Sequence, residues 1–239
     1  MTVLQENLEK LEEAIAAACR LAGRARSEVE FMAVSKTKPA AALVEAAALG
    51  LTLFGENRVQ EFAAKAVELG AARGGMRCHL IGQLQSNKAS KAAEIFDAVD
   101  SLDSFRLAER LNEAAGKCDK RLPVLIEVKL SPEETKAGLP PESDEAAQLL
   151  DRLPDFVHLE TRGLMTIAPW GAPDDVTRAC FRSLRTLRDR WAQAYSKLNL
   201  DVLSMGMSGD FALAIAEGAT RIRVGTALFG KRITQPEKQ

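Results

Sequence analysis

Cysteine is scarce and scattered in this chain. No two cysteines lie at a spacing typical of metal ligands, and there is no CxxC pair and no Cys/His cluster, so we expect neither a disulfide framework nor a metal site. We interpret the cysteines as reduced packing residues of a cytoplasmic protein, with redox activity of one of them as the alternative. The four are Cys19, Cys78, Cys118 and Cys180.

Long apolar runs and basic stretches are also missing. The N-terminal segment MTVLQENLEKLEEAIAAACR alternates charged and apolar residues and lacks the uninterrupted apolar stretch of a signal peptide. No later stretch approaches membrane-spanning length, so a membrane role is not expected. The net charge is −1, and no basic stripe is interleaved with aromatic residues, so nucleic acid is not expected as a partner.

The chain does contain a repeated alternation of short apolar runs and helical segments. A helix with Leu4, Leu8, Leu11 and Ile15 on one face comes first and ends near Gly23. Strands are then predicted at 31–35, 51–54, 78–82, 98–102, 123–129, 161–167, 201–206 and 221–225. The helices between and after them are predicted at 41–49, 58–69, 86–96, 104–115 with Gly116 as its stop, 143–153, 174–198, 210–218 and 226–230.

Such alternation predicts an α/β protein with a parallel sheet. Eight units in this length indicate a closed (β/α)₈ TIM barrel with an extra N-terminal helix, and an open doubly wound sheet is the alternative. Glycine and polar residues follow nearly every strand, which favours the barrel. No linker, low-complexity tract or change in composition divides the chain, so we predict one domain over residues 1–239.

Two glycine-rich loops follow the last two predicted strands, SMGMSGD at 204–210 and VGTALFG at 224–230. Barrels of this type often bind phosphate at these loops. We expect Ser208 or Asp210 to cap the next helix and leave backbone N–H groups available to an anion. Gly225 would allow close approach, and Thr226 adds a hydroxyl. The alternative is that these residues are ordinary caps and turns.

The last predicted strand, RIRVG, places Arg221 and Arg223 on the face opposite Ile222 and Val224. Outward faces of a barrel pack against helices and are apolar, so both arginines should point inward, where each guanidinium requires an acceptor. For Arg221 we expect an ion pair with a carboxylate such as Glu127. Arg223 lies nearer the carboxyl end of the strand, where a ligand would bind.

A lysine follows the first predicted strand, within FMAVSKTKPA at 31–40. Lys36 would lie beside the last strand when the barrel closes, and a desolvated amine near an arginine has a lowered pKa. A neutral amine forms a Schiff base with an aldehyde. Together with the phosphate loops, this indicates pyridoxal phosphate or a phosphosugar as the ligand. Alternatively, Lys36 only extends into solvent, or Lys38 or Lys129 carries the reactive amine.

Six stretches resemble one known family. AVSKTKP, FGENRVQE, HLIGQLQSNK, GLMTI, LSMGMSGDF and RVGTALFG are similar to the pyridoxal phosphate homeostasis proteins, relatives of the alanine racemase barrel domain, over about residues 28–230. FGENRVQE and HLIGQLQSNK are together highly specific. The chain departs from the family at Lys129, where asparagine is common, and keeps the pairing of Lys136 with Gly138.

The resemblance implies pyridoxal 5′-phosphate as the cofactor, held as a Schiff base on a lysine. It implies phosphate contacts from the two glycine-rich loops, an arginine facing the pyridine nitrogen, and an asparagine at the ring or its substituents. The resemblance implies the Schiff base for Lys36 and the phosphate contacts for Ser208, Gly225 and Thr226. It implies that Arg223 faces the pyridine nitrogen and that Asn57 lies at the ring or its substituents.

Other residues of these stretches have several possible roles. His79 either braces the site through hydrogen bonds or is a satisfied interior histidine. A polar group after the third strand borders the cofactor, contacts a partner or caps the next helix. This group comprises Gln83, Gln85, Asn87 and Lys88.

An arginine at the pyridine nitrogen favours the unprotonated ring, which is a weak electron sink. A two-base racemase also needs a proton-transfer group opposite the lysine, and Tyr195, the only tyrosine, is predicted on a helix outside the barrel. We therefore predict a monomeric, cytoplasmic protein for vitamin B6 and amino acid homeostasis that binds pyridoxal phosphate, hands it to apo-enzymes and lacks strong catalytic activity. An amino acid racemase and a Schiff-base aldolase are the alternatives.

Overall fold

The computed structural model describes residues 1–131 and 137–230. Eight parallel strands pair in chain order, and the first also pairs with the last, so the sheet is a closed barrel. The expected barrel is thus confirmed, and the open sheet is wrong. Its strands are β1 Glu30–Val34, β2 Leu53–Glu56, β3 Arg77–Leu80, β4 Ala98–Leu102, β5 Leu122–Glu127, β6 Leu159–Met165, β7 Val202–Ser204 and β8 Arg221–Val224.

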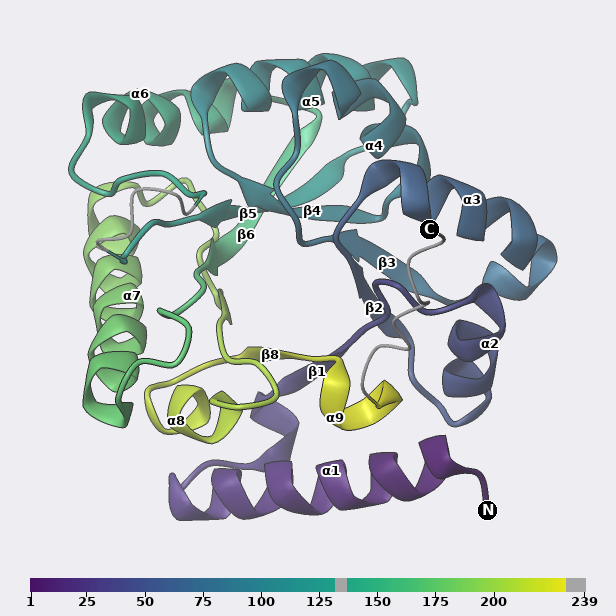
Figure 1. Ribbon diagram of the computed structural model, residues 1–239. Helices are drawn as coiled ribbons and strands as arrows, with labels where there is room; N and C mark the ends of the chain where they lie inside the picture. Colours follow the sequence, from purple (N-terminus) through teal and green to yellow (C-terminus); the bar gives the residue numbers. More distant parts are fainter. Residues whose placement is uncertain (132–136, 231–239) are drawn as a thin grey trace, which may run out of the picture.

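Helices form a ring outside the strands (Figure 1). The α-helices are α1 Val3–Leu21, α2 Ala40–Ala48, α3 Val59–Leu69, α4 Ala89–Ile95, α5 Phe105–Lys117, α6 Asp144–Arg152, α7 Asp174–Ala194, α8 Phe211–Ala216 and α9 Thr226–Phe229. Short 3₁₀ helices are η1 Arg26–Glu28, η2 Gly70–Arg73, η3 Ser86–Lys88 and η4 Leu153–Asp155.

The N-terminal helix α1 covers the side of the barrel where the chain closes. Thr2 caps it by accepting a hydrogen bond from the Gln5 amide, and one apolar face that includes Leu11 and Ile15 is buried. In Figure 1 the helix runs alongside α8 and α9, and Asn7 Nδ2 donates to the Leu228 carbonyl of α9 at 3.0 Å. The extra N-terminal helix is therefore confirmed, and it packs on the element that follows the last strand.

Side chains of the strands alternate between an outer and an inner face, as a β-strand requires. On the outer face, Phe31 and Ala33 of β1 join the apolar cluster that the helices cover. Met32 lies between them, is fully buried, and is not part of that cluster, so it fills the lumen. Gly55 of β2 faces it, since a β-carbon there would lie 2.7 Å from the Met32 sulfur.

Most helix ends differ from the prediction by a few residues, and two of them bear on packing. Gly116 does not stop α5, which continues to Lys117. The glycine instead packs closely on His158, since a β-carbon would lie 2.9 Å from the imidazole. Helix α7 ends at Ala194, four residues earlier than expected, and Tyr195 follows it and packs against the outer apolar cluster. The predicted position of Tyr195 outside the barrel is thus confirmed.

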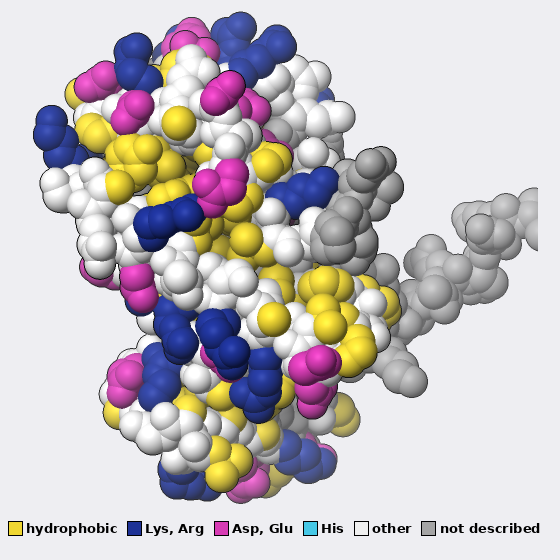
Figure 2. All heavy atoms as spheres, turned by 90° about the vertical axis from the view of Figure 1, so that its left-hand side faces the viewer, with side chains coloured by type: hydrophobic (Ala, Val, Ile, Leu, Met, Phe, Trp, Pro, Cys, Tyr) yellow, Lys and Arg dark blue, Asp and Glu magenta, His cyan; other side chains and the backbone are white. Residues whose placement is uncertain are grey.

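Arginines fasten α7 to α8. Figure 2 views the α7 side of the molecule and shows lysine and arginine side chains gathered on this face. Arg182 Nη2 lies 2.9 Å from Glu217 Oε1, and Arg178 Nη1 lies 3.6 Å from the same oxygen. Arg185 Nη1 donates to the Glu217 carbonyl at 3.1 Å. The bond from Arg182 is the largest influence holding the pKa of Glu217 below its usual value.

The packing role expected for the cysteines fits three of the four residues. Cys19, Cys78 and Cys180 are buried thiols, and burial raises the pKa of Cys78 to about 12. Cys118 is exposed and is not a packing residue, because it lies just beyond the end of α5. No helix in the described parts of the chain is both long and apolar enough to cross a membrane.

Candidate functional site

Lys36 lies two residues beyond the end of β1, at the carboxyl end of the barrel, and is half-buried. A tight turn carries it: the Lys38 amide donates to the Ser35 carbonyl at 3.1 Å. Thr37 adopts a left-handed φ of 65°, which is a rare conformation for a β-branched residue. Such a conformation persists only where surrounding contacts impose it.

Those contacts come from α3 and β2. Glu61 Oε1 accepts from the Thr37 amide at 2.5 Å, and Ser35 Oγ donates to Glu56 Oε1 at 2.7 Å. Lys65 connects the two carboxylates: its ammonium lies 2.8 Å from an oxygen of each and donates to the Ser35 carbonyl at 2.9 Å. Burial raises the pKa of Glu56, while the bonds from Lys65 and Ser35 oppose that shift. This buried cluster fixes the backbone on both sides of Lys36.

The two rival lysines have other positions. Lys38 donates from its ammonium to the carbonyls of Phe229 and Gly230, at 2.8 and 3.2 Å, so it fastens the first loop to the end of α9. Lys129 follows β5 and is half-buried, and its amide donates to the Leu139 carbonyl at 3.0 Å. Lys136, the partner expected for Gly138, lies outside the described residues.

Arg223 points into the lumen beside β1, as expected. It pairs in register with Met32 and is only 4% exposed. Its Nη1 donates to the carbonyl and hydroxyl of Ser204 at 2.7 and 2.9 Å, and its Nη2 donates to the Thr166 carbonyl at 2.9 Å. Burial lowers the pKa of the guanidinium, and nearby carboxylates oppose that shift. Ser204 and Thr166 hold this arginine, and the sequence pattern did not single out either residue.

The two glycine-rich loops meet. Ser208 Oγ accepts from the Ala227 amide at 3.4 Å, so the loop after β7 contacts the start of α9. Gly225 lies against β1, where a β-carbon would come 3.0 Å from the Val34 carbonyl oxygen, and Thr226 beside it is exposed. The structure thus brings Ser208, Gly225 and Thr226 together.

The expected helix cap in this loop is wrong. Neither Ser208 nor Asp210 makes a side-chain cap for α8. The carboxylate of Asp210 instead folds back within the loop and accepts from the Met207 amide at 2.5 Å. Gly206 has a φ of 93° and packs against α8, since a β-carbon would lie 2.6 Å from that of Ala214. The loop is therefore shaped by its own turn rather than by a helix cap.

Asn57 and Gln83 border the mouth of the barrel from the β2 and β3 side. Asn57 follows β2 and is half-buried, and Gly82 packs so closely on its backbone that a β-carbon there would overlap the Asn57 carbonyl. Gln83 follows β3 and lies close enough to Asp103, which follows β4, to oppose slightly the rise that burial causes in the pKa of that carboxyl. Gln85 and Lys88 precede η3 and α4 but make no side-chain cap, so the capping alternative is wrong for both.

Arg221 belongs to an ion network deeper in the lumen. Its Nη1 donates to Asp100 at 3.1 Å and its Nε to Glu30 at 2.7 Å. His79 Nδ1 lies 3.0 Å from the other Asp100 oxygen, so His79 is a satisfied interior histidine that also braces this network. The neighbouring His79 and Arg221 hold the pKa of Asp100 below its usual value against the effect of burial. The predicted ion pair between Arg221 and Glu127 is wrong, because Arg221 pairs with Asp100 and Glu30.

Glu127 lies higher in the barrel, at the carboxyl end of β5, and is 5% exposed. Its Oε2 is a buried side-chain oxygen with no hydrogen-bond partner among the described residues. Burial is the main cause that raises the pKa of Glu127 to about 7, with a further rise from Asp103 and an opposing effect of Arg223. A buried acceptor without a donor is uncommon in proteins and requires an explanation.

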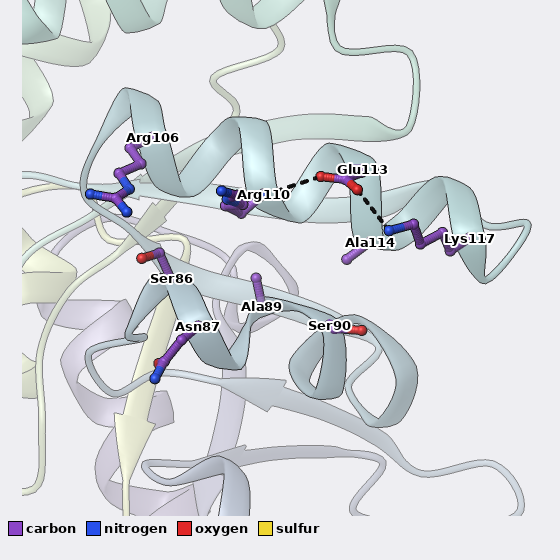
Figure 3. A pocket seen from close by; sticks show the side chains of 9 residues that line it. All are labelled: Ser86, Asn87, Ala89, Ser90, Arg106, Arg110, Glu113, Ala114 and Lys117. Atoms are coloured by element: carbon purple, nitrogen blue, oxygen red, sulfur yellow. Dashed lines mark hydrogen bonds and ion pairs between the residues drawn. The ribbon is translucent and has the colours of Figure 1, made fainter.

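A separate groove of about 290 Å³ lies between α4 and α5, with η3 at one end. Figure 3 shows Ser86 and Asn87 on one side, and Glu113 on the other side between Arg110 and Lys117. The Glu113–Lys117 contact is 2.7 Å. None of the six predicted cofactor residues lines this groove.

Comparison with known proteins places these features in a family. The family model described as alanine racemase, N-terminal domain, matches residues 7–233. The pyridoxal phosphate homeostasis protein of Vibrio cholerae is 42% identical over 241 residues, which cover 97% of this chain and 98% of the relative. The chain belongs to the pyridoxal phosphate homeostasis protein family. The pyridoxal phosphate homeostasis protein of Pseudomonas aeruginosa is 43% identical over 233 residues, which cover 97% of this chain and 97% of the relative.

A solved structure of a family member contains the cofactor. PipY from Synechococcus elongatus with pyridoxal phosphate bound superposes with a TM-score of 0.81 and is 46% identical, covering 90% of this chain and all of PipY. Family membership confirms the resemblance seen in the sequence motifs, and the barrel is of the alanine racemase N-terminal-domain type. The roles of the individual site residues stay predictions.

Proposed function

We propose that this chain binds pyridoxal 5′-phosphate covalently through Lys36 and holds it for cofactor homeostasis. The observation that carries the proposal is the meeting of three groups at one side of the barrel mouth: Lys36 after β1, Arg223 in β8, and the Ser208–Gly225 loop pair. A phosphorylated aldehyde is the ligand class that uses all three, because the aldehyde condenses with an amine while the phosphate accepts N–H and O–H donors.

The residues present fit this cofactor. Gly225 leaves room where a side chain would press on the Val34 carbonyl, and Ser208 and Thr226 add hydroxyls beside the Ala227 amide. Arg223 is fixed by three hydrogen bonds, which suits a residue that orients a planar ring. Relatives at about 40% identity carry the name pyridoxal phosphate homeostasis protein, and PipY binds pyridoxal phosphate, which supports the same ligand here.

We assign Arg223 to the pyridine nitrogen and Asn57 to the ring edge. An arginine gives up its proton only above about pH 12, so it leaves the ring nitrogen unprotonated and the ring a weak electron sink. The chain's residues would then hold the cofactor rather than activate it. We propose a cytoplasmic monomer that passes the cofactor to apo-enzymes.

An amino acid racemase is the second candidate. Tyr195 packs outside the barrel and cannot serve as the second proton-transfer group. Glu127, a lumen carboxyl with a pKa near neutrality, is the observation that favours this candidate. Racemisation assays on a panel of amino acids, with Lys36→Ala as the control, separate the two functions.

Borohydride reduction followed by mass spectrometry tests the proposed function. Protein saturated with pyridoxal phosphate should carry a reduced pyridoxyl phosphate adduct on Lys36. Lys38→Ala should be labelled equally, whereas Lys36→Ala should lose the label and the yellow absorbance. An adduct on Lys38 or Lys129, or no adduct, contradicts the proposal.

A further inference from the structure

Among the described residues, no hydrogen-bond partner of Glu127 Oε2 explains the burial of this side chain. It is the last residue of β5 and pairs in register with Met165 of β6. Leu125 and Met165 are buried but do not belong to the outer apolar cluster, so this part of both strands faces the lumen. The Glu127 carboxyl therefore points into the barrel at its carboxyl end, the end where Lys36 lies. Ligands of such barrels bind at this end.

The charged groups that act on Glu127 come from two other elements. Asp103, in the loop between β4 and α5, adds a like charge, and Arg223 of β8 adds an opposite one. Arg223 does not satisfy the carboxyl, because its hydrogen bonds within the described residues go to Ser204 and Thr166. Asp103 is itself half-buried, and burial raises its pKa. Glu127 thus has an open hydrogen-bonding position in a partly acidic corner of the mouth.

We propose that Glu127 is a proton-linked contact of the bound cofactor. When protonated, it donates a hydrogen bond to an oxygen of the phosphorylated ligand, and when ionised it repels that anion. This inference rests on the proposed function and extends it to regulation: binding is strongest while Glu127 keeps its proton and weakens as the pH rises through neutrality. By reciprocity, the ligand raises the pKa of Glu127.

The test uses pyridoxine 5′-phosphate, an alcohol analogue that cannot condense with Lys36. Its dissociation constant is measured by calorimetry from pH 6 to 8.5 for the wild type and Glu127→Gln. The ligand's own ionisations are identical for both proteins and cancel in the ratio. At pH 6 the two affinities should be similar, because glutamine keeps the shape and a donor. Above pH 7 the wild type should weaken relative to the variant, approaching tenfold for each pH unit, as one linked proton requires.

Two further variants sharpen the measurement. Asp103→Asn removes the like charge that helps to raise the pKa of Glu127, so the fall in affinity of this variant should begin at lower pH than that of the wild type. Glu94→Gln is the matched control, because Glu94 is 59% exposed and bonds only to Lys91 of the same helix in the described contacts. Its affinity ratio to the wild type should stay constant across the pH range. A constant ratio for Glu127→Gln overturns the proposal.

A direct titration covers the case in which Glu127→Gln does not fold. In the ligand-free wild type labelled with ¹³C-glutamate, one side-chain carboxyl resonance should titrate near pH 7, and its midpoint should rise when pyridoxine 5′-phosphate is added. No such resonance, or a midpoint unmoved by the ligand, overturns the inference. Labelling of Lys36 by pyridoxal phosphate and borohydride distinguishes the two failures: a labelled Lys36 with no linked proton leaves the proposed function standing, whereas an unlabelled Lys36 refutes that function.

Discussion

Replacing Lys65 with methionine should strongly destabilise the barrel. The substitution keeps most of the apolar volume but removes an ammonium that bonds Glu56, Glu61 and the Ser35 carbonyl. The Glu56 side chain is 0% exposed, so its carboxylate would be left buried and without its cation. Breaking a buried ion pair by removing one partner costs about 3–5 kcal/mol. That is a large part of the roughly 5–15 kcal/mol that stabilises a typical domain.

Urea unfolding at pH 7 measures this effect, with Lys91→Met as the matched control. Lys91 lies 2.8 Å from Glu94, the same distance as in the buried pair, but both side chains are about half exposed. Exposed pairs contribute about 0–1 kcal/mol, so the control should lose no more than that. The comparison separates burial from distance as the source of the effect.

A double-mutant cycle with Glu56→Gln tests the reasoning itself. The double variant has no buried charge to compensate, so its loss should be smaller than the sum of the two single losses by about 1 kcal/mol or more. The Lys65→Met deficit should also shrink as the pH falls towards the ordinary value for glutamate, because burial raises the pKa of Glu56 and protonation removes the charge. A loss below about 1 kcal/mol for Lys65→Met, or strict additivity, refutes the argument.

Three other predictions concern the lumen and its rim. Glu127→Gln should stabilise the ligand-free protein by about 3 kcal/mol at pH 8 but not at pH 4.5. The pKa of Glu127 is about 7 in the folded state and 4.5 ordinarily, so the ionised side chain destabilises the fold only as the pH rises between these two values. An equal effect of the substitution at both pH values contradicts this prediction. Asp100→Asn should lose about 3–5 kcal/mol at pH 7, since Arg221 and His79 lose their carboxylate. The pKa of Asp100 is lower in the folded state than in the unfolded state. Its contribution to stability is therefore complete above the unfolded-state pKa and is lost as the pH falls through the folded-state pKa, so the loss caused by the substitution should diminish in acid. A pH-independent loss in urea unfolding contradicts this prediction. Gly82→Ala should cost about 3 kcal/mol or more in thermal unfolding, because its β-carbon meets backbone at Asn57 rather than a flexible side chain; a neutral effect would show that the two loops separate freely.

The barrel could be predicted because each strand and helix is signalled by residues that lie close together in the sequence. Alternating apolar runs and glycine-rich ends recur along the chain, and every strand predicted from them exists with its ends within two residues of the prediction. The position of Arg223 could be predicted for the same reason, since alternation within one strand decides which face a side chain occupies.

Partners across the lumen were less predictable. Arg221 and Glu127 both point inward, but one begins β8 and the other ends β5, so they lie at different heights. The alternation of side chains along a strand predicts which face a residue occupies. It does not predict how high the residue lies along the barrel axis, because that height depends on the register of all the strands. The same limit applies to Ser208, whose hydroxyl meets the Ala227 amide of another loop instead of its own helix. Gly116 was misread because its packing partner, His158, is distant in sequence.

The closure of β1 on β8 has a consequence for the nascent protein. Lys36 emerges early in synthesis, whereas Arg223 and Gly225 are among the last residues of the described chain, and the two groups become neighbours only when the final strand joins the first. Protein synthesis proceeds from the N-terminus, so a chain that ends before β8 carries the Lys36 amine without Arg223 and Gly225, the residues proposed to contact the ligand. Under the proposed function, retention of a reactive aldehyde on Lys36 requires a chain that extends through β8, and fragments that end before β8 should not retain it.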